Sequence, residues 1–177
     1  TTTWASRTIA ATMLGAHFPT SRVGYAVGEG GAIRKSTAGG LTWATKASGT
    51  STNLNEAAFG SATVGWVGGD AGVIRKTTDG GTTWTAQTSG TALPVYGMHA
   101  IDTSTLYAAA LDTEEFSTGA LLKTTNGGTT WSTLRSGADT VVGGVAFVDA
   151  TTGWAAGASG TILKTTDSGS TWSSQTS

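Results

Sequence analysis

The residues of this chain best suited to chemistry are two histidines and a small number of carboxylates. His17 and His99 precede apolar residues in matching segments, and two imidazoles beside one channel could bind a metal ion or transfer protons. The sequence has no cysteine, which excludes disulfides, zinc–thiolate sites and cysteine nucleophiles. Because the carboxylates are scattered, we expect the histidines to be hydrogen-bonded at strand edges, with no metal site and no cofactor.

Two of the carboxylates, Asp79 and Asp167, belong to a phrase that occurs four times. The third copy has Asn126 at this position, and the first has Ala38. An Asp or Asn side chain can accept a hydrogen bond from the backbone N–H group two residues on, and Gly81 can adopt the positive φ of such a turn. We therefore interpret the aspartates and the asparagine as structural turn residues. Each copy ends in a tryptophan that we expect to pack over the turn: Trp43, Trp84, Trp131 and Trp172.

The tryptophans are spaced by 41, 47 and 41 residues, and a period near 40 residues predicts a repeat fold. Each unit contains four short runs of β-branched and aromatic residues, separated by glycine, serine and aspartate. In the second unit these runs predict strands at 55–59, 65–68, 73–77 and 82–87. Four strands in a repeat of this length are typical of a propeller blade. The sequence therefore predicts an all-β propeller of four antiparallel blades, over residues 8–49, 50–90, 91–137 and 138–177.

The third unit is six residues longer than the others, and the natural place for the excess is Asp112–Ser117. Insertions in repeats map to loops, often on the binding face. The segment supplies four candidate partner-binding residues, with two arginines as candidate neighbours: Asp112, Glu114, Glu115, Phe116, Arg22 and Arg135. The alternative is a solvated loop without a binding role.

Residues 1–7 precede the first blade and end like a copy of the phrase, because Trp4 lies 39 residues before Trp43. We interpret this segment as an extra outermost strand. Both termini then supply the same strand of a blade. Three arrangements follow: a closed four-bladed ring with an extra strand, a piece of a larger propeller, or a partial ring completed by another copy in a homo-oligomer.

The composition narrows the classes of partner. Charged residues make up 12% of the chain, against roughly 25% in an average soluble domain, and the net charge is −1. The chain has no basic run, so we expect no nucleic-acid partner. It also lacks an apolar run near the roughly 20 residues of a membrane span, so we expect neither a membrane span nor a signal peptide. Its abundant threonine, serine and glycine favour an extracellular, periplasmic or virion-surface location.

The repeated phrase resembles the Asp-box, or BNR repeat, with full matches at Thr77–Trp84 and Thr165–Trp172. Together with the upstream segment that contains Gly65–Trp66, it is similar to the photosystem II stability and assembly-factor propellers. The resemblance implies that the turn joins the third and fourth strands at the outer rim of a blade. It is specific for the fold and much less so for function.

Sialidases also carry Asp-boxes, and their active sites need three convergent arginines, a tyrosine–glutamate pair and an aspartate. Here Arg34 and Arg75 occupy equivalent positions before the repeated lysines, and two of the three tyrosines belong to predicted core strands. We therefore expect a protein that is not an enzyme. The leading interpretation is a binding or assembly scaffold that presents its face loops to a protein partner. The alternatives are a lectin-like glycan-binding module and a structural component of an extracellular filament, surface layer or virion.

Overall fold

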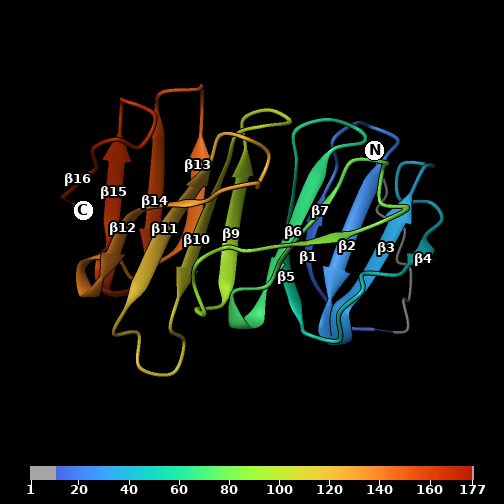
Figure 1. Cartoon of the computed structure of the whole chain (residues 1–177), viewed down its shortest axis with the longest axis horizontal. Coiled ribbons are helices and arrows are strands. Elements are labelled where there is room, and N and C mark those ends of the chain that lie inside the picture. The colour runs from blue at the N-terminus through green and yellow to red at the C-terminus, as the bar shows by residue number, and fades with distance from the viewer. Residues whose placement is uncertain (1–10, 177) are drawn as a thin grey trace, which may run out of the picture.

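The computed structural model describes residues 11–176, which form four separate antiparallel sheets of four strands each (Figure 1). The sequence order of the strands is also their order within each sheet. The first sheet contains β1 (Met13–His17), β2 (Gly24–Gly28), β3 (Ala32–Ser36) and β4 (Ala44–Lys46). The second contains β5 (Leu54–Phe59), β6 (Gly65–Gly69), β7 (Ile74–Thr77) and β8 (Thr85–Gln87).

The third and fourth sheets repeat this meander. The third contains β9 (Val95–Ala100), β10 (Leu106–Leu111), β11 (Gly119–Thr124) and β12 (Ser132–Gly137). The fourth contains β13 (Val142–Phe147), β14 (Gly153–Gly157), β15 (Ile162–Thr165) and β16 (Ser173–Ser174). The only helical elements in the described part of the chain are four single 3-10 turns, η1 to η4. The predicted all-β fold with four four-stranded blades is confirmed.

The sheets stand side by side, and the first strand of each packs against the first strand of the next, in the order β1, β5, β9, β13. Figure 1 shows the first sheet at one end of this row and the fourth at the other. Over residues 11–176, the row is open at both ends, so these residues alone do not form the closed four-bladed ring that was one of the three predicted arrangements. The predicted extra strand at 1–7 lies outside the described residues.

The fourth strand of the second sheet is shorter than predicted, because β8 begins at Thr85 and not at Thr82. The backbone N–H groups of Thr82 and Thr83 donate to the side chain of Asp79 instead of to a neighbouring strand. The residues before Thr85 therefore belong to the turn.

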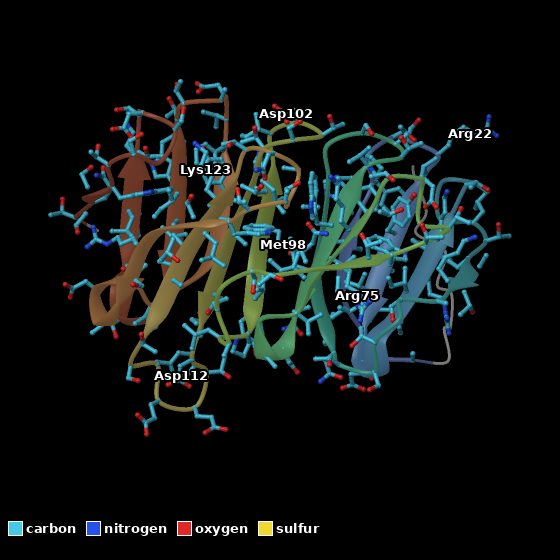
Figure 2. All side chains as sticks on the ribbon, in the orientation of Figure 1. Arg22, Arg75, Met98, Asp102, Asp112 and Lys123 are labelled. Atoms are coloured by element: carbon cyan, nitrogen blue, oxygen red, sulfur yellow. The ribbon has the colours of Figure 1, made fainter. Side chains whose placement is uncertain are left out.

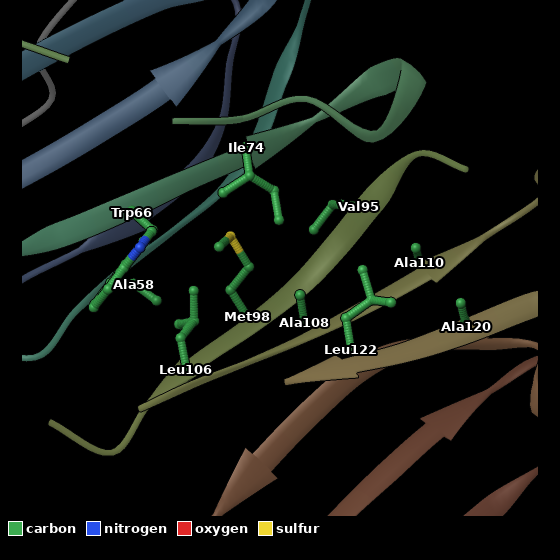
Figure 3. Close-up of a cluster of buried hydrophobic side chains, with 10 residues drawn as sticks. All are labelled: Ala58, Trp66, Ile74, Val95, Met98, Leu106, Ala108, Ala110, Ala120 and Leu122. Atoms are coloured by element: carbon green, nitrogen blue, oxygen red, sulfur yellow. The ribbon is translucent and has the colours of Figure 1, made fainter. Parts of the chain in front are cut away.

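The core lies between successive sheets rather than within one. Tyr25 of β2 stacks on Phe59 of β5, with ring centroids 3.9 Å apart, and Tyr107 of β10 stacks on Phe147 of β13 at 4.0 Å. Between the second and third sheets, Trp66 replaces the tyrosine and packs in a cluster with Met98 and Leu106 (Figure 3). The corresponding place on the third sheet is Ala100, so the larger indole meets a smaller neighbour.

The connections between second and third strands all lie at one edge of the row (Figure 1). In three sheets the connection is a three-residue 3-10 turn: Glu29–Gly31, Asp70–Gly72 and Ala158–Gly160. In the third sheet β10 and β11 are joined by residues 112–118. The structure thus places the six-residue insertion in this connection.

Candidate binding surfaces

The repeated Asp-box forms a turn held by two side-chain oxygens. In the second sheet, the Thr77 hydroxyl oxygen accepts a hydrogen bond from the N–H of Gly81 at 2.8 Å. Asp79 Oδ1 accepts from the N–H groups of Thr82 and Thr83 at 3.0 and 2.9 Å, and Oδ2 accepts from the Thr83 hydroxyl at 2.7 Å. The aspartate therefore binds N–H groups three and four residues on. The group two residues on, which we expected, is bound by the threonine.

These hydrogen bonds also fix the charge of the turn. The Thr83 hydroxyl, followed by the Thr83 backbone N–H, lowers the pKa of Asp79 from 3.8 to about 2. In the fourth sheet, the same bonds from Thr171 lower the pKa of Asp167 to about 2. Such carboxylates stay ionised near neutral pH, and neither could serve there as a general acid.

The third and first boxes have a different residue at the position of the aspartate. Asn126 Oδ1 accepts from the Thr130 N–H at 2.9 Å, while its Nδ2 donates to the Thr130 hydroxyl at 2.8 Å. In the first box, Ala38 has no acceptor, but Ser36 Oγ still accepts from the N–H of Gly40 at 2.9 Å. The Ser/Thr oxygen is therefore common to all four turns, and the aspartate is not.

Three of the box tryptophans reach from the turn into the core between two sheets, and the fourth, Trp43, packs within its own sheet. Trp84 is buried and meets Phe59 edge-on at 6.2 Å, and Trp172 meets Phe147 in the same way at 6.1 Å. Trp131 is half-buried against the cluster between the second and third sheets, and Trp43 meets Phe18 edge-on at 5.9 Å. These contacts make the tryptophans packing residues.

The two histidines are half-buried, and each lies against an aromatic ring of the next sheet. His17 stacks on Phe59 at 5.9 Å, and His99 lies 6.0 Å from the ring of Phe147. Burial lowers the pKa of both, and the charge of His99 lowers that of His17 further. No group of three or more metal-binding side chains occurs among residues 11–176.

The insertion in the third sheet forms an exposed acidic loop, which projects beyond its neighbours (Figure 2). Asp112 Oδ1 accepts from the N–H of Glu114 at 3.0 Å, and the Ser117 hydroxyl donates to Oδ2 at 3.2 Å. The Glu114 N–H bond is the main cause that lowers the pKa of Asp112. Phe116 has a φ of 50° and is 52% exposed. The loop therefore presents negative charge and one aromatic ring to solvent.

The two candidate arginines do not join this loop. Figure 2 shows Arg22 at the opposite edge of the row from Asp112. Arg135 Nε donates to the Thr140 hydroxyl at 3.1 Å, and its Nη1 donates to the Trp172 carbonyl at 3.5 Å, so it links the third and fourth sheets. The six candidates do not form one cluster.

The loop shares its edge with other acidic residues that the sequence reading missed. Glu29 and Asp70 open the 3-10 turns of the first two sheets, and Asp139 lies in η3 (Ala138–Thr140), beside the end of β12. Glu29 and Asp70 share this edge because the second-to-third connections all lie there, and Asp139 joins them because β12 ends beside the start of β11. The sequence alone shows neither arrangement. We call this set, with residues 112–117, the acidic edge.

The repeated lysines were also missed as linking residues. Each of three lysines lies over an aromatic ring of its own sheet and donates to a carbonyl in the box turn of the next sheet. The bonds are Lys35 Nζ to Gly80 at 2.7 Å, Lys76 Nζ to Gly127 at 2.7 Å, and Lys123 Nζ to Ser168 at 2.8 Å. The signal was present in the sequence, because a lysine opens every copy of the phrase.

An open cleft of about 250 Å³ lies on the outer strands of the first sheet, between Lys35 and Lys46, with Trp43 in its lining. Within the described residues, no helix is long and apolar enough to cross a membrane.

Comparisons with known proteins agree with this geometry. A family model described as photosynthesis system II assembly factor YCF48 matches residues 2–143. The structure of YCF48 from Cyanidioschyzon merolae has a TM-score of 0.72 at 20% identity, covering 94% of this chain and 57% of that chain. A structure of YCF48 bound to D1 peptide has a TM-score of 0.59 at 16% identity, covering 93% and 82%.

An enzyme shares the fold as well. The GH74 enzyme of Niastella koreensis has a TM-score of 0.71 at 20% identity, covering 93% of this chain but only 29% of that chain. No curated protein matches the sequence. The chain thus spans about half of the Cyanidioschyzon merolae protein and under a third of the GH74 enzyme. At these identities, the structural likeness shows the fold alone.

The expected extracellular, periplasmic or virion-surface location is wrong. The matching family model describes a factor of photosystem II assembly, which is a process of the photosynthetic cell. The expectation came from the many threonine, serine and glycine residues. The structure shows that residues of these types form the box turns, as Thr77 and Gly81 do, so the composition reflects the repeat and not the compartment.

Proposed function

Because the chain belongs to the photosystem II assembly factor YCF48 family, we propose that it is a non-catalytic protein that binds a protein segment during assembly of a larger complex. The observation that carries this proposal is the family match over residues 2–143 of 177. The structure of a relative bound to D1 peptide supports a protein segment as the type of ligand.

The state of the carboxyl groups supports the absence of catalysis. Asp79, Asp112, Asp149 and Asp167 accept hydrogen bonds from their own turns, which lower the pKa of each. Burial raises the pKa of Glu56, whose Oε1 accepts a hydrogen bond from the N–H of Ala57. A glycosidase of the GH74 kind would be expected to use two facing carboxyl groups.

We place the partner on the acidic edge, with the loop 112–117 at its centre. The loop carries two exposed glutamates and an exposed phenylalanine on a backbone that blade pairing does not require, and loops on rigid scaffolds often carry function. A partner segment with basic and apolar residues would complement this surface. The glycan-binding and filament alternatives have no comparable support.

The test is a titration of the chain with a D1 peptide, followed by calorimetry. The variant E114Q/E115Q/F116G removes the charges and the ring, and glycine suits the positive φ of residue 116. We expect this variant to bind at least about tenfold more weakly, which corresponds to about 1.4 kcal/mol. Arg22→Gln, at the opposite edge, should bind as the unaltered chain does.

The two parts of the proposal fail separately. Binding that is equal in the loop variant and the unaltered chain would contradict the loop as the site. If the unaltered chain captures neither the D1 peptide nor the isolated D1 protein, the assembly role itself is contradicted.

A further inference from the structure

Asn126 differs from the other two asparagines of the chain because a glycine follows it. It is exposed in the box turn of the third sheet, whereas Asn53 and Asn55 precede larger residues and donate through their amide groups to Asp70. Glycine has no Cβ, so the backbone nitrogen of Gly127 is sterically accessible to the carboxamide carbon of the preceding side chain. An exposed Asn–Gly pair is therefore arranged for loss of the side-chain amide.

We propose that Asn126 is a site of spontaneous deamidation, that the closed turn delays the reaction, and that the fold accepts the aspartate product but not the isoaspartate product. In the first step the Gly127 nitrogen attacks Cγ of Asn126 and forms a C–N bond. The proton of this nitrogen passes to Nδ2, which leaves as ammonia. Water then adds to one of the two carbonyl carbons of the cyclic imide and breaks its bond to the nitrogen, which recovers a proton. The balance is a water molecule consumed and an ammonia molecule released, without oxidation or reduction.

The closed turn restrains both reacting groups. The Gly127 N–H donates to the Ser104 carbonyl at 2.8 Å, which opposes the loss of its proton. On the carboxamide, Oδ1 accepts from the Thr124 hydroxyl at 3.0 Å and from the Thr130 N–H at 2.9 Å, and Nδ2 donates to the Thr130 hydroxyl at 2.8 Å. Formation of the imide has to break these bonds, so it proceeds from a locally opened turn or from the unfolded chain.

The aspartate product fits the third turn, because the same turn holds an aspartate in the second and fourth sheets. In the second sheet, Asp79 Oδ1 accepts from the Thr83 N–H at 2.9 Å and Oδ2 accepts from the Thr83 hydroxyl at 2.7 Å, and the fourth sheet repeats these bonds. Replacement of Nδ2 by oxygen therefore needs only a rotation of the Thr130 hydroxyl, which then donates instead of accepting. Lys76 Nζ donates to the Gly127 carbonyl at 2.7 Å, so a positive charge lies near the new carboxylate.

The isoaspartate product does not fit the turn. Its main chain runs through Cβ and Cγ of the former asparagine, so the path to the nitrogen of Gly127 is longer by one atom. The added length displaces Gly128, whose N–H donates at 2.8 Å to the buried hydroxyl of Thr124. A buried donor without its acceptor destabilises the folded chain, so folding selects against this product.

The charge of the aspartate product prevents further reaction. An ionised carboxylate is a poor target for a nucleophile, because its leaving group would be an oxide ion. Asp79 is also followed by a glycine, and hydrogen bonds from Thr83 lower its pKa to about 2. The same bonds in the third turn would keep the product ionised near neutral pH. Deamidation therefore ends at aspartate and adds one negative charge to the box turn.

The test follows the reaction in the folded and the unfolded chain. The unaltered chain is incubated in mildly alkaline buffer with and without concentrated urea, and peptide mass spectrometry measures the mass gain at each asparagine. We expect Asn126 to react at least about tenfold faster in urea, because reaction in the folded chain requires opening of the turn. Asn53 and Asn55 should react much more slowly than Asn126 in urea.

Variants of the turn test the protection. Thr130→Val removes the hydroxyl that accepts from Nδ2 of Asn126, so it should raise the rate in the folded chain several-fold. Thr130→Ser keeps the hydroxyl and should restore the slow rate. Thr125→Val alters an exposed neighbour and is the matched control, which should react as the unaltered chain does. Circular dichroism checks that each variant is folded.

Refolding tests the selection between the two products. After partial deamidation in urea, the chain is refolded and treated briefly with a protease. The surviving chain should contain aspartate at position 126, and the digested fraction should contain the isoaspartate. Asn126→Asp represents the accepted product and should resist urea at least as well as the unaltered chain. The proposal is overturned if folded and unfolded chains react at equal rates, if both products survive the protease equally, or if Asn126→Asp unfolds at a lower urea concentration.

Discussion

Each Asp-box turn depends on two oxygen atoms that differ in their surroundings. The Thr77 hydroxyl is buried, and it binds the N–H of Gly81, where φ is 77°. The Asp79 carboxylate is exposed and binds the outer part of the turn. The buried oxygen is present in all four boxes, as serine or threonine, whereas a carboxylate is absent from the first box, which has Ala38, and from the third, which has Asn126. Removal of the buried oxygen should therefore harm the turn in any of the four sheets.

Thr77→Val keeps the shape of the side chain but leaves the Gly81 N–H without its acceptor. An unsatisfied buried donor costs about 1–3 kcal/mol, so the free energy of unfolding should fall by about that amount. Urea denaturation measures the change. Thr83→Val, in the exposed part of the same turn, is the matched control and should cost less. Equal losses in the two variants would contradict the ranking.

The carboxylates make the turns sensitive to acid. Hydrogen bonds from Thr83 and Thr171 hold the pKa of Asp79 and Asp167 at about 2, below the ordinary 3.8. Because the folded pKa is the lower one, the contribution of these bonds is complete above pH 3.8 and is lost as the pH falls through about 2. Asp79→Asn should fold with the bonds seen at Asn126, and its melting temperature should fall less between pH 4 and 2. Melting curves with identical pH dependence would argue against this role.

The sequence identified the turn residues because each repeat shows them in the same place. It did not identify their hydrogen-bond partners correctly. The choice between N–H groups two, three or four residues on depends on the Thr77 hydroxyl, which takes the Gly81 N–H first. Competition between two nearby acceptors is a matter of geometry that residue types alone do not decide.

At the scale of elements, the connection between β10 and β11 shows how the insertion fits the sheet. Removal of Asp112–Ser117 would leave Leu111, Thr118 and Gly119 between Ala110 and Ala120. This is the same number of residues as Asp70–Gly72, with glycine again in the third place, where φ of Gly72 is 69°. The repeat spacing predicted this segment correctly. It gave no sign of which residues lie beside the loop, since Arg22 belongs to a connection at the opposite edge.

Deletion of Asp112–Ser117 combined with Thr118→Gly should therefore restore a short turn. Glycine is needed because the middle residue of these turns has a positive φ, which is 54° at Ala71. We expect the deletion variant to retain a cooperative thermal transition within a few degrees of the original. The same deletion with Thr118 kept should be less stable by about 1–2 kcal/mol. A loss of the transition in the glycine variant would show that the loop supports the fold.

At the scale of the whole molecule, equivalent residues contribute unequally to the free energy of unfolding. Phe59 lies between two sheets, whereas Phe18 lies on the outer face of the first sheet. Phe59→Ala empties a place between two sheets and should cost about 3–5 kcal/mol of unfolding free energy. Phe18→Ala alters the same position of the first sheet, where the ring is 45% exposed, and should cost much less. Denaturation of both variants measures the difference. Similar costs would contradict the role of burial in this difference.

The repeats predicted the four sheets, but they did not predict whether the sheets close into a ring. The number of sheets follows from counting the repeated phrases, whereas closure of the row depends on how neighbouring sheets are angled, which residue types do not reveal. Trp66 with Ala100 and Tyr25 with Phe59 are different pairings at equivalent places between sheets. The difference is visible only when residues 34 or more positions apart, Tyr25 and Phe59 among them, are known to touch.

The third sheet accommodates additional residues in the connection between its second and third strands. Residues 112–118 replace a short turn, yet Ala110 and Ala120 remain paired across the sheet. Glu29–Gly31, Asp70–Gly72 and Ala158–Gly160 occupy the matching place in the other sheets. Each is therefore a site where a guest peptide can be grafted without a change of strand register. Peptides grafted at all four connections would project from the same edge in a fixed order, which would suit the study of multivalent binding.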